Sequence, residues 1–255
     1  MITHYYRPKT LEEALKLLSQ PNTLPLGGGT RLTQPGGNSF SVVDLQALDL
    51  NQLRKSGNNL EVGAAVTLQV LLDSPYAPPA LKHAIELEAP MNLRNLGTVA
   101  GALVTCDGRS TFGTMLLAQD ANCSLVSIQS NPPGMLATIR LGDLLPLRDS
   151  LLSGKLITKI EIPLNVKMAF EIVARTPADK PIVCAALAQW PSGRTRLALG
   201  GWGLAPALTM DGNEPGGVQD AARNACTEAV DEWASSEYRL EIAGILAKRC
   251  QEAAK

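Results

Sequence analysis

The sequence predicts an α+β protein, and three observations support that prediction. Short apolar strands alternate with amphipathic helices over roughly the first two thirds of the 255 residues. After Pro163 the pattern changes to strands alone, at Met168–Ala174, Pro181–Trp190 and Thr195–Leu199. The tail, 218–254, then reads as helical. This order favours two halves rich in strand–helix units, followed by an antiparallel sheet covered by helices.

The first 55 residues read as strand, helix, turn and strand. Thr10 followed by Glu13 is a capping-box pattern, and the apolar stripe within Leu11–Leu18 continues it as a helix. Thr23–Leu26 is a short apolar strand that runs directly into glycines, and Ser41–Leu45 is a second one.

The pattern restarts at Leu60, where Leu60–Ala64 reads as a strand and Thr67 begins a helix. Further helices are expected near Ala80–Leu87 and at Met115–Asp120. Three more strands are expected, at Ser124–Ile128, Met135–Arg140 and Leu156–Ile162.

We predict a domain boundary just after Pro163, because the strand-only pattern starts there. The first domain spans 1–164, with subdomains of about 1–55 and 56–164, and the second spans 165–255. In the second, Pro191–Gly193 is expected to be a turn, and Val218–Trp233 and Arg239–Ala254 are expected to be helices.

Composition argues against several classes of protein. With 45% apolar residues the chain can bury a sizeable core, and a net charge of −1 gives no reason to expect nucleic acid or an anionic membrane surface. The five cysteines contain no CxxC pair, which argues against a zinc or iron–sulfur site within this chain and favours a reducing compartment. The N-terminus has no signal-peptide pattern and no apolar run reaches membrane-spanning length, so we expect a cytoplasmic protein.

Three consecutive glycines, Gly27–Gly29, follow the strand Thr23–Leu26 and lead into Thr30. Glycine adopts positive φ and has no Cβ, so successive backbone N–H groups can point into one concavity and bind phosphate oxygens. Thr30 adds a hydroxyl donor. A tight strand-exit turn without a ligand explains the same residues equally simply.

A second stretch, Asn95–Leu103, also interrupts apolar residues with small ones. It allows close backbone approach, although a packed helix or strand contact would use the same residues. Neither stretch has the G-x-G-x-x-G spacing of a Rossmann site or the G-K-[ST] ending of a P-loop. Nicotinamide and ATP sites of those two types are therefore disfavoured.

Taken together, the two stretches resemble the flavin-binding subunits of the molybdenum hydroxylases. That family includes the carbon monoxide dehydrogenase medium subunit and the FAD domain of xanthine dehydrogenase. Its first loop reads A-G-G-T-[DN]-L, where Gly27–Leu32 reads GGGTRL. Its second loop reads [IV]-R-N-x-G-T-[IT]-G-G-N-L, where Leu93–Leu103 reads LRNLGTVAGAL.

The resemblance extends along nearly the whole chain. Tyr6–Ala14 is similar to the family's F-x-x-P-x-S-L-x-E-A start, and Leu117–Ala121 to its L-L-A-L-D-A helix. Ile157–Pro163 resembles its L-I-x-x-I-x-I-P strand, and Arg196–Gly201 its R-I-A-L-G-G strand. Tyr238-Arg239 stands where a Y-R begins the family's last helix.

The resemblance implies a fold of the vanillyl-alcohol-oxidase/p-cresol-methylhydroxylase (PCMH/VAO) type, with a C-terminal domain of the carbon monoxide dehydrogenase flavoprotein type. FAD would lie extended between the two N-terminal subdomains, with the third unit covering the flavin. The residues implied on one side of the diphosphate are Gly27, Gly28, Gly29, Thr30 and Arg31. Those implied on the other side are Thr98, Val99, Ala100, Gly101 and Ala102. Asp107 matches an aspartate that contacts the ribityl chain or caps a helix, and Ile157 matches an apolar position near the isoalloxazine.

Five positions depart from the family pattern. Ala100 replaces a glycine, Ala102 replaces Asn or Ser, and Thr111 stands where xanthine dehydrogenases have Asp. Glu171 occupies a position that is basic in some members, and Arg31 adds a cation beside the expected phosphates. Each lost contact is expected to weaken the binding of FAD by about 1 kcal/mol, which does not abolish the site.

The resemblance implies electron transfer within a multi-subunit molybdenum hydroxylase. Electrons would pass from [2Fe–2S] clusters to FAD on this chain and then to an external acceptor. A molybdopterin-binding large subunit and a [2Fe–2S] small subunit would be separate polypeptides, and a homo-oligomer is also compatible with the sequence. Substrate hydroxylation would take place on the large subunit, so no catalytic residue is expected here.

Two alternatives stay open at the level of sequence. The departures at Ala100, Ala102 and Thr111 fit a degenerate paralogue that keeps the fold, binds FAD weakly or not at all, and acts as a structural or interaction subunit. A stand-alone flavin oxidase is the other, but no proton-transfer residue supports it.

Overall fold

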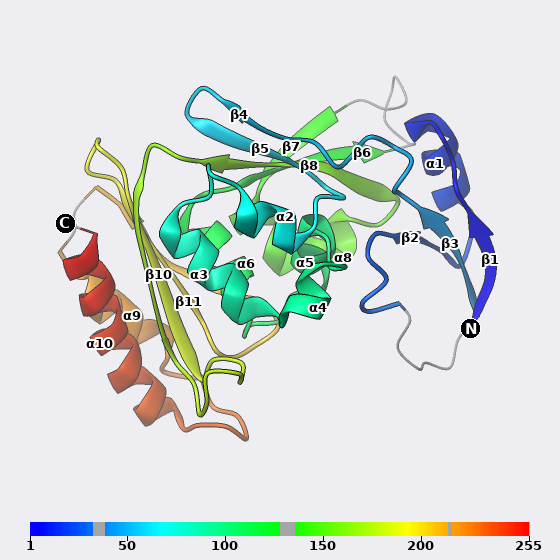
Figure 1. The fold of residues 1–255 in the computed structure, drawn as a ribbon. Helices are drawn as coiled ribbons and strands as arrows, with labels where there is room; N and C mark the ends of the chain where they lie inside the picture. The colour runs from blue at the N-terminus through cyan, green and yellow to red at the C-terminus, as the bar shows by residue number, and fades with distance from the viewer. Residues whose placement is uncertain (33–38, 128–135, 214–215, 255) are drawn as a thin grey trace.

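In the described part of the chain, three β-sheets follow one another (Figure 1). The computed structural model describes residues 1–32, 39–127, 136–213 and 216–254. The first sheet lies at one end of the molecule, the second in the middle and the third at the other end, with helices packed between the second and third (Figure 1).

The first sheet has the order β1-β3-β2, and both pairings are parallel. Its elements are β1 (Ile2–Tyr6), α1 (Leu11–Leu18), β2 (Thr23–Leu26) and β3 (Phe40–Asp44). Thr10 caps α1, since its Oγ1 accepts the amide of Glu13 at 3.2 Å. The predicted helix start is therefore confirmed, and α1 buries Ala14 and Leu15 against the sheet.

The second sheet is antiparallel with the order β4-β5-β8-β6-β7. Its strands are β4 (Leu53–Ser56), β5 (Asn59–Gly63), β6 (Asn122–Ser127), β7 (Leu136–Arg140) and β8 (Lys155–Pro163). The helices of this part are α2 (Leu68–Asp73), α3 (Pro79–Glu88), α4 (Met91–Arg94), α5 (Val99–Thr105), α6 (Thr111–Ala118), α7 (Leu141–Leu144), the 3-10 turn η1 (Leu145–Leu147) and α8 (Arg148–Leu151). Every residue of α6 is buried, so α6 forms the centre of the largest apolar core.

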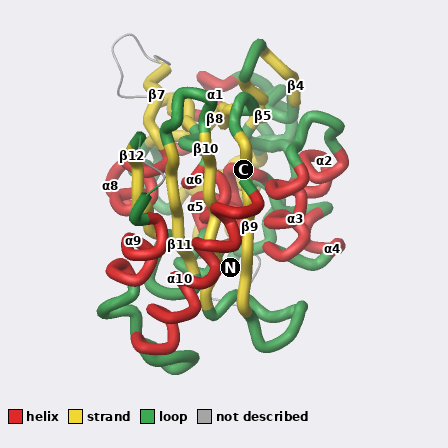
Figure 2. Tube along the Cα trace, turned by 90° about the vertical axis from the view of Figure 1, so that its left-hand side faces the viewer, coloured by secondary structure: helices red, strands yellow, loops and turns green. Residues whose placement is uncertain are grey.

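The third sheet is antiparallel with the order β12-β11-β10-β9. Its elements are β9 (Lys167–Val173), β10 (Val183–Gln189), β11 (Thr195–Gly200), β12 (Ala207–Gly212), α9 (Val218–Ala225) and α10 (Ser236–Ala253). Alternate residues of β10 face opposite cores, so Cys184 and Ala186 pack toward α6 while Ala185 and Leu187 pack toward α9 and α10. Both helices lie on one face of this sheet, α10 over β9 and β10 and α9 over β11 and β12 (Figure 2).

A buried arginine ties the third sheet to the C-terminal end of α6. Arg196 of β11 is 2% exposed, and its guanidinium donates to the carbonyl of Leu117 at 3.0 Å. The same group donates to Asp211 at 2.6 Å and lies 3.2 Å from a carboxylate oxygen of Asp120. Because these acceptors come from both sides of the interface, the pairing fixes how the third sheet sits on α6.

Most predicted elements are confirmed, and the differences described next lie in the third sheet and in the two C-terminal helices. The third sheet has four strands where three were predicted, because β12 carries a mixed pattern and forms an edge. The helix predicted at Val218–Trp233 ends at Ala225, since the following segment turns to present the carbonyls of Ala229 and Ala234 to Arg239. The last helix begins before Arg239, because Ser235 caps it.

Some predictions are left undecided. Ile128 and Met135, the ends of two predicted strands, lie outside the described residues. The domain boundaries near 55 and 164 stay predictions, although the three sheets follow the same order. None of the helices in the described segments is long and apolar enough to cross a membrane.

Candidate functional site: a cavity between the first and second sheets

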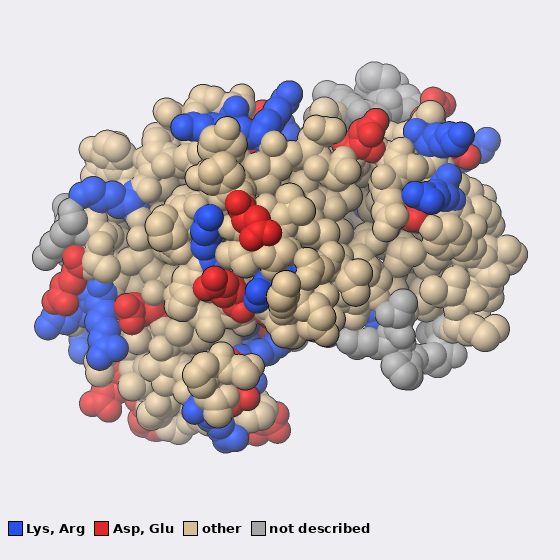
Figure 3. All heavy atoms as spheres, in the orientation of Figure 1, with Lys and Arg blue, Asp and Glu red and all other residues tan. Residues whose placement is uncertain are grey.

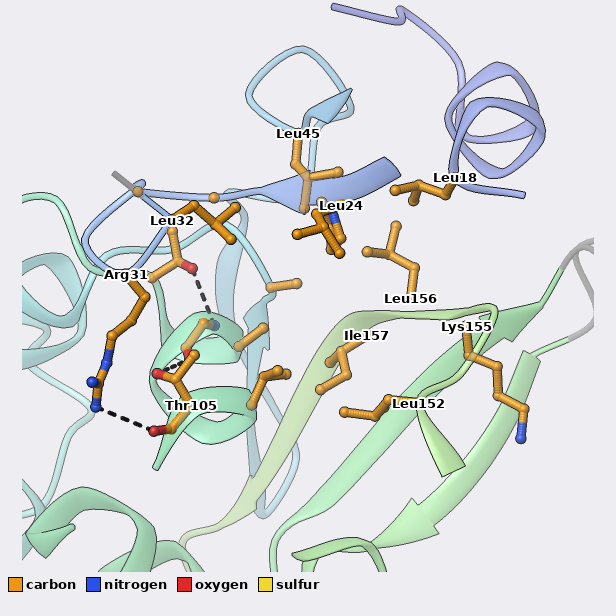
Figure 4. A pocket seen from close by; sticks show the side chains of 18 of the residues that line it. Leu18, Leu24, Arg31, Leu32, Leu45, Thr105, Leu152, Lys155, Leu156 and Ile157 are labelled. Carbon is orange, nitrogen blue, oxygen red and sulfur yellow. Dashed lines mark hydrogen bonds between the residues drawn. The ribbon is translucent and has the colours of Figure 1, made fainter. Parts of the chain in front are cut away.

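A cavity of about 420 Å³ lies where the first sheet meets the second. Its walls come from the end of β2 and the turn after it, from α5, and from the segment that enters β8 (Figure 4). This volume falls within the range of about 300–1,000 Å³ that is typical of small-molecule sites.

The two glycine-rich stretches touch each other at this cavity. A Cβ on Gly28 would lie 1.7 Å from the carbonyl oxygen of Leu96, and one on Gly27 would lie 2.7 Å from Oγ1 of Thr98. Gly29 has φ of 71°, in the left-handed region that glycine adopts at low cost. Gly27 and Gly28 are therefore required by the contact between the two turns.

The first turn has backbone donors to spare. Among the described residues, the amides of Gly27 and Gly28 have no hydrogen-bond acceptor. Buried or half-buried N–H groups without acceptors are costly, so a ligand anion at this turn would satisfy two of them. The turn thus fits the diphosphate of a dinucleotide.

The second stretch offers fewer donors than its sequence suggests. The amide of Val99 donates to Val66 at 2.8 Å, that of Ala100 to Ala64 at 3.3 Å, and that of Gly101 to the side chain of Thr98 at 3.2 Å. The first amides of α5 are thus already paired within the protein. This wall can support a ligand by shape and by the partial positive charge of a helix end, but not by these hydrogen bonds.

Arg31 supplies a positive charge at the cavity. Its guanidinium donates to the carbonyl of Thr105 at 3.4 Å, a long bond to the last residue of α5 (Figure 4). Arg31 is otherwise exposed, so its side chain can turn toward an anion on the neighbouring turn.

The opposite part of the cavity is apolar. Leu18, Leu24 and Leu45 of the first unit face Leu152, Leu156 and Ile157 of the second (Figure 4). Such a slot between two leucine-rich walls fits a planar aromatic ring. Of these residues only Ile157 was singled out from the sequence. Gly154, with φ of 65°, makes the turn before β8. This glycine was the sequence feature that could have pointed to Leu152 and Leu156 as part of the cavity wall.

Nine of the residues predicted for the cofactor site line the cavity, and three do not. The nine are Gly27, Gly28, Gly29, Thr30, Arg31, Thr98, Ala100, Gly101 and Ile157. Val99 is fully buried in the core beside the cavity, and Ala102 packs against the same core.

Asp107, the third of these, pairs with a residue of the third unit. Its carboxylate lies 2.5 Å from Nζ of Lys180 and accepts the amide of Arg109 at 2.9 Å. Burial alone raises the pKa of Asp107, but the hydrogen bond and charge of Lys180, with smaller contributions from Arg109 and Arg31, hold it below its usual value. Asp107 is thus an ionised link between the second and third units.

The departures at Thr111 and Glu171 lie away from the cavity lining. Thr111 donates to the carbonyl of Ala84 at 2.7 Å and to the carboxylate of Glu88 at 3.1 Å. Glu88 also accepts the amide of Phe112 at 2.9 Å, so a carboxylate from α3 stands at the start of α6. Glu171 is on β9, on the face covered by α10, where burial and, to a smaller extent, the charge of Glu171 raise the pKa of the Cys250 thiol.

The geometry defines a class of protein: two units enclose between them a small-molecule cavity with a glycine-rich turn at one part and an apolar slot at another. The family model described as the FAD binding domain in molybdopterin dehydrogenase matches residues 1–165. The chain belongs to this family; FAD is its cofactor and it is a component of an oxidoreductase.

Relatives in sequence cover between 62% and 98% of the chain. The chain is 28% identical to a glyceraldehyde dehydrogenase medium chain from Sulfolobus acidocaldarius, over 95% of this chain and 94% of the relative. It is 25% identical to the carbon monoxide dehydrogenase medium chain of Afipia carboxidovorans, over 98% and 96%. It is 29% identical to the nicotinate dehydrogenase FAD-subunit of Eubacterium barkeri, over 62% and 57%.

Solved structures show the same fold. A carbon monoxide dehydrogenase chain from Hydrogenophaga pseudoflava superposes with a TM-score of 0.81 at 23% identity, over 100% of this chain and 97% of that one. A chain of quinoline 2-oxidoreductase from Pseudomonas putida 86 gives 0.79 at 22% identity, over 100% and 96%. The predicted α+β architecture of PCMH/VAO type is confirmed.

Proposed function

We propose that this chain is the electron-transfer subunit of a multi-subunit molybdenum hydroxylase. It receives electrons from the [2Fe–2S] clusters of a small subunit and passes them to an external acceptor, while a molybdopterin-binding large subunit hydroxylates the substrate. The relatives described as medium chains and as a FAD-subunit support this role. The structural observation on which this proposal depends concerns Gly27 and Gly28. Both residues lie against the second glycine-rich stretch, and their backbone amides have no acceptor among the described residues, so they are available to a diphosphate.

The bound flavin supplies the redox chemistry, and the residues of this chain bind and orient it. Gly27–Thr30 hold the diphosphate through backbone amides and a hydroxyl, and Arg31 adds charge. Thr98–Ala102 form the opposite wall, with Ala100 and Gly101 at the ligand and Val99 and Ala102 supporting them from the core. Ile157 would pack against the bound cofactor in the apolar slot and keep water from that part of it. Asp107 holds the segment between β9 and β10 in place through its ion pair with Lys180.

The first test is the visible spectrum of the chain purified from its own cells together with the subunits that accompany it. We expect flavin bands near about 370 and 450 nm and one FAD per chain, as in other flavoproteins. Iron and molybdenum in the same complex are expected in the accompanying subunits. A complex without flavin bands would contradict the proposal.

The degenerate-paralogue alternative is tested by the double substitution Ala100→Gly/Ala102→Asn. Because the methyl of Ala100 lines the cavity, we expect the double variant to bind FAD up to about tenfold more tightly, with wild type already fully occupied. The measurement is the Kd of FAD for chain stripped of its flavin. Flavin bound by the double variant and absent from wild type would support the alternative.

The substitution Arg31→Ala is expected to weaken FAD binding about tenfold, which corresponds to about 1.4 kcal/mol. The reason is loss of a cation beside two phosphates, so the affinity of the variant should also depend less on ionic strength. Titration of flavin-free protein at two salt concentrations measures both effects. Lys155→Ala is the matched control, since Lys155 lines the cavity but its amine points away from it (Figure 4). Equal effects of the two substitutions would refute the assignment of Arg31.

A further inference from the structure

Two residues of the second glycine-rich stretch, Arg94 and Asn95, have no role in the cofactor site described above. They belong to the run LRNLGTVAGAL, in which the expected contacts with the cofactor begin only at Thr98. Neither residue lines the cavity. Arg94 instead joins three helices of the second unit, α2, α3 and α4, which lie together in Figure 1.

The guanidinium of Arg94 meets three acceptors on two neighbouring helices. Its Nε donates to the side-chain oxygen of Gln69 on α2 at 3.0 Å. Its Nη1 donates to the carbonyls of Ala89 at 2.8 Å and Glu86 at 3.2 Å, at the C-terminal end of α3. The last carbonyls of a helix have no partner within that helix, so Arg94 satisfies two groups that α3 leaves unpaired.

The helix that carries Arg94 depends on these bonds for its position. α4 has only four residues, and no side chain caps its N-terminus. Asn95 donates from its side chain to the carbonyl of Met91 at 2.9 Å, which closes the turn on itself but does not attach it to a neighbour. A single helical turn is not stable alone in water, because too few hydrogen bonds offset the ordering of its backbone. The bonds from Arg94 to α2 and α3 therefore fix where α4 lies.

From α4 the same constraint reaches the wall of the cofactor cavity. The amide of Gly97 donates to the carbonyl of Leu93, a residue of α4, at 2.7 Å. The residues on either side of Gly97 are the ones that touch the first turn. The carbonyl oxygen of Leu96 would lie 1.7 Å from a Cβ on Gly28, and Thr98 stands beside the neighbouring glycine. The place of α4 therefore decides how closely the two glycine-rich stretches meet.

The geometry of the Arg94 side chain matters here more than its charge. Its three acceptors are neutral groups, and a planar guanidinium presents several donors in fixed directions. A lysine would bring the same charge on a flexible stem without this arrangement of donors. Figure 3 shows acidic and basic side chains mixed on the side of the molecule seen in Figure 1, so no broad positive field attracts an anionic ligand there.

We propose that Arg94 is a positioning residue of the FAD site. It fixes α4, and α4 holds the segment from Leu96 to Thr98 against the first turn. Without the bonds of Arg94 this segment moves away from Gly28, and the two amides available to the diphosphate lose their support. The inference rests on the proposed function, because it takes the diphosphate of FAD to lie at the first turn.

The test compares the FAD affinity of three variants of the flavin-free, full-length chain. Arg94→Met keeps an unbranched apolar stem and removes all three bonds, so we expect FAD to bind about tenfold more weakly. Arg94→Lys keeps the charge without the fork, and Gln69→Ala removes one acceptor, so each is expected to lose about threefold. Arg54→Met is the matched control and should keep wild-type affinity, because Arg54 pairs with a side chain of β5 and lies outside the cavity lining.

Two further measurements separate positioning from a general loss of stability. The first is the ³¹P NMR spectrum of bound FAD at saturation, in which we expect shifted diphosphate resonances for Arg94→Met and wild-type resonances for Arg54→Met. A chain that is only less stable would hold saturating FAD in the wild-type geometry. The second is the affinity of the double variant Gly27→Ala/Arg94→Met. Because Gly27→Ala already disturbs the contact with Thr98, the double variant should lose less affinity than the product of the two single losses.

Wild-type affinity in both Arg94→Met and Gln69→Ala would overturn the proposal. Unchanged ³¹P resonances or a fully multiplicative loss in the double variant would also overturn it, since Arg94 would then act independently of the first turn. Full rescue by Arg94→Lys would show that charge alone suffices, against the proposal. Circular dichroism identifies a variant that does not fold; if Arg94→Met is one, Arg94→Lys and Gln69→Ala decide the question by the same readings.

These outcomes differ from those that would contradict the proposed function. A wild-type complex without FAD, or one that holds FAD and transfers no electrons, contradicts the proposed function. A wild-type chain that binds FAD no better than its Arg94 and Gln69 variants contradicts only the role of Arg94.

Discussion

Replacing Gly28 by alanine is expected to abolish FAD binding, with a loss in affinity of 100-fold or more. The added Cβ would lie 1.7 Å from the backbone carbonyl of Leu96, a distance that no side-chain rotation can relieve. The two glycine-rich stretches would have to separate, which removes the free amides of Gly27 and Gly28 from the position where a diphosphate meets them. A hundredfold loss corresponds to about 2.7 kcal/mol, and the lost hydrogen bonds to a charged group account for that amount.

The effect is measured by flavin content after purification and by titration of FAD into flavin-free protein. Gly212→Ala is the matched control, because a Cβ at Gly212 would meet nothing within 4 Å. Gly27→Ala is a graded variant: its Cβ would meet only the side chain of Thr98, at 2.7 Å, so a smaller loss is expected. Far-UV circular dichroism shows whether each variant is folded. Stoichiometric FAD in folded Gly28→Ala would contradict the proposed role of this turn.

Much of the fold could be predicted from the sequence because local rules determine it. Thr10, Thr67 and Ser235 cap helices at positions where the side-chain pattern marks a start, although only the first two were read as such. The strands of the second and third sheets are apolar runs bounded by proline or glycine. β4 and β12 were missed, since LRKS and ALTMDG carry too few buried residues to stand out and owe their conformation to their neighbours.

The site was predicted only in part, because its local features are visible in the sequence and its long-range contacts are not. The glycines of the first turn are visible in the sequence, but nothing in it shows that the amides of Val99, Ala100 and Gly101 are already paired. The leucines opposite, such as Leu24 and Leu156, were indistinguishable from core residues, because their role depends on which two units face each other. The packing of the first unit against the second brings these leucines to the cavity, and a single sequence carries no visible signal of that packing.

The same limit applies to the charged residues of the third unit. The resemblance marked Arg239 as the beginning of a helix, whereas the structure shows it 0% exposed and fully surrounded. It donates to four backbone carbonyls and to both oxygens of Asp231. The interruption of the predicted helix after Ala225 follows from this arginine, because the intervening segment bends to satisfy it.

Arg239→Met is accordingly expected to destabilise the protein by about 3–5 kcal/mol, the usual result of breaking a buried charge pair on one side. Methionine keeps the apolar stem but leaves the carbonyls of Ile182 and Ala229 without a donor. The free energy of unfolding in urea measures the loss. Arg249→Met, at an exposed position on the same helix, is expected to change it by less than about 0.5 kcal/mol. Similar unfolding free energies of the two variants would show that the buried contacts of Arg239 do not stabilise the fold.

The partner of Arg239 adds a dependence on pH. Burial by itself raises the pKa of Asp231, but the hydrogen bond from Arg239 and those from the amides of Trp233 and Ala234 hold it below its ordinary value of 3.8. A carboxyl whose pKa is lower in the folded state stabilises that state above the ordinary value, and the stabilisation is lost as pH falls through the folded-state pKa. Wild type should therefore exceed Asp231→Asn in unfolding free energy at pH 7, and the difference should shrink below about pH 4, since the carboxyl is then increasingly protonated. A difference that stays constant down to pH 2 would mean that the amide and the carboxyl are held by the same neutral contacts, and that the charge of Asp231 contributes nothing to the fold.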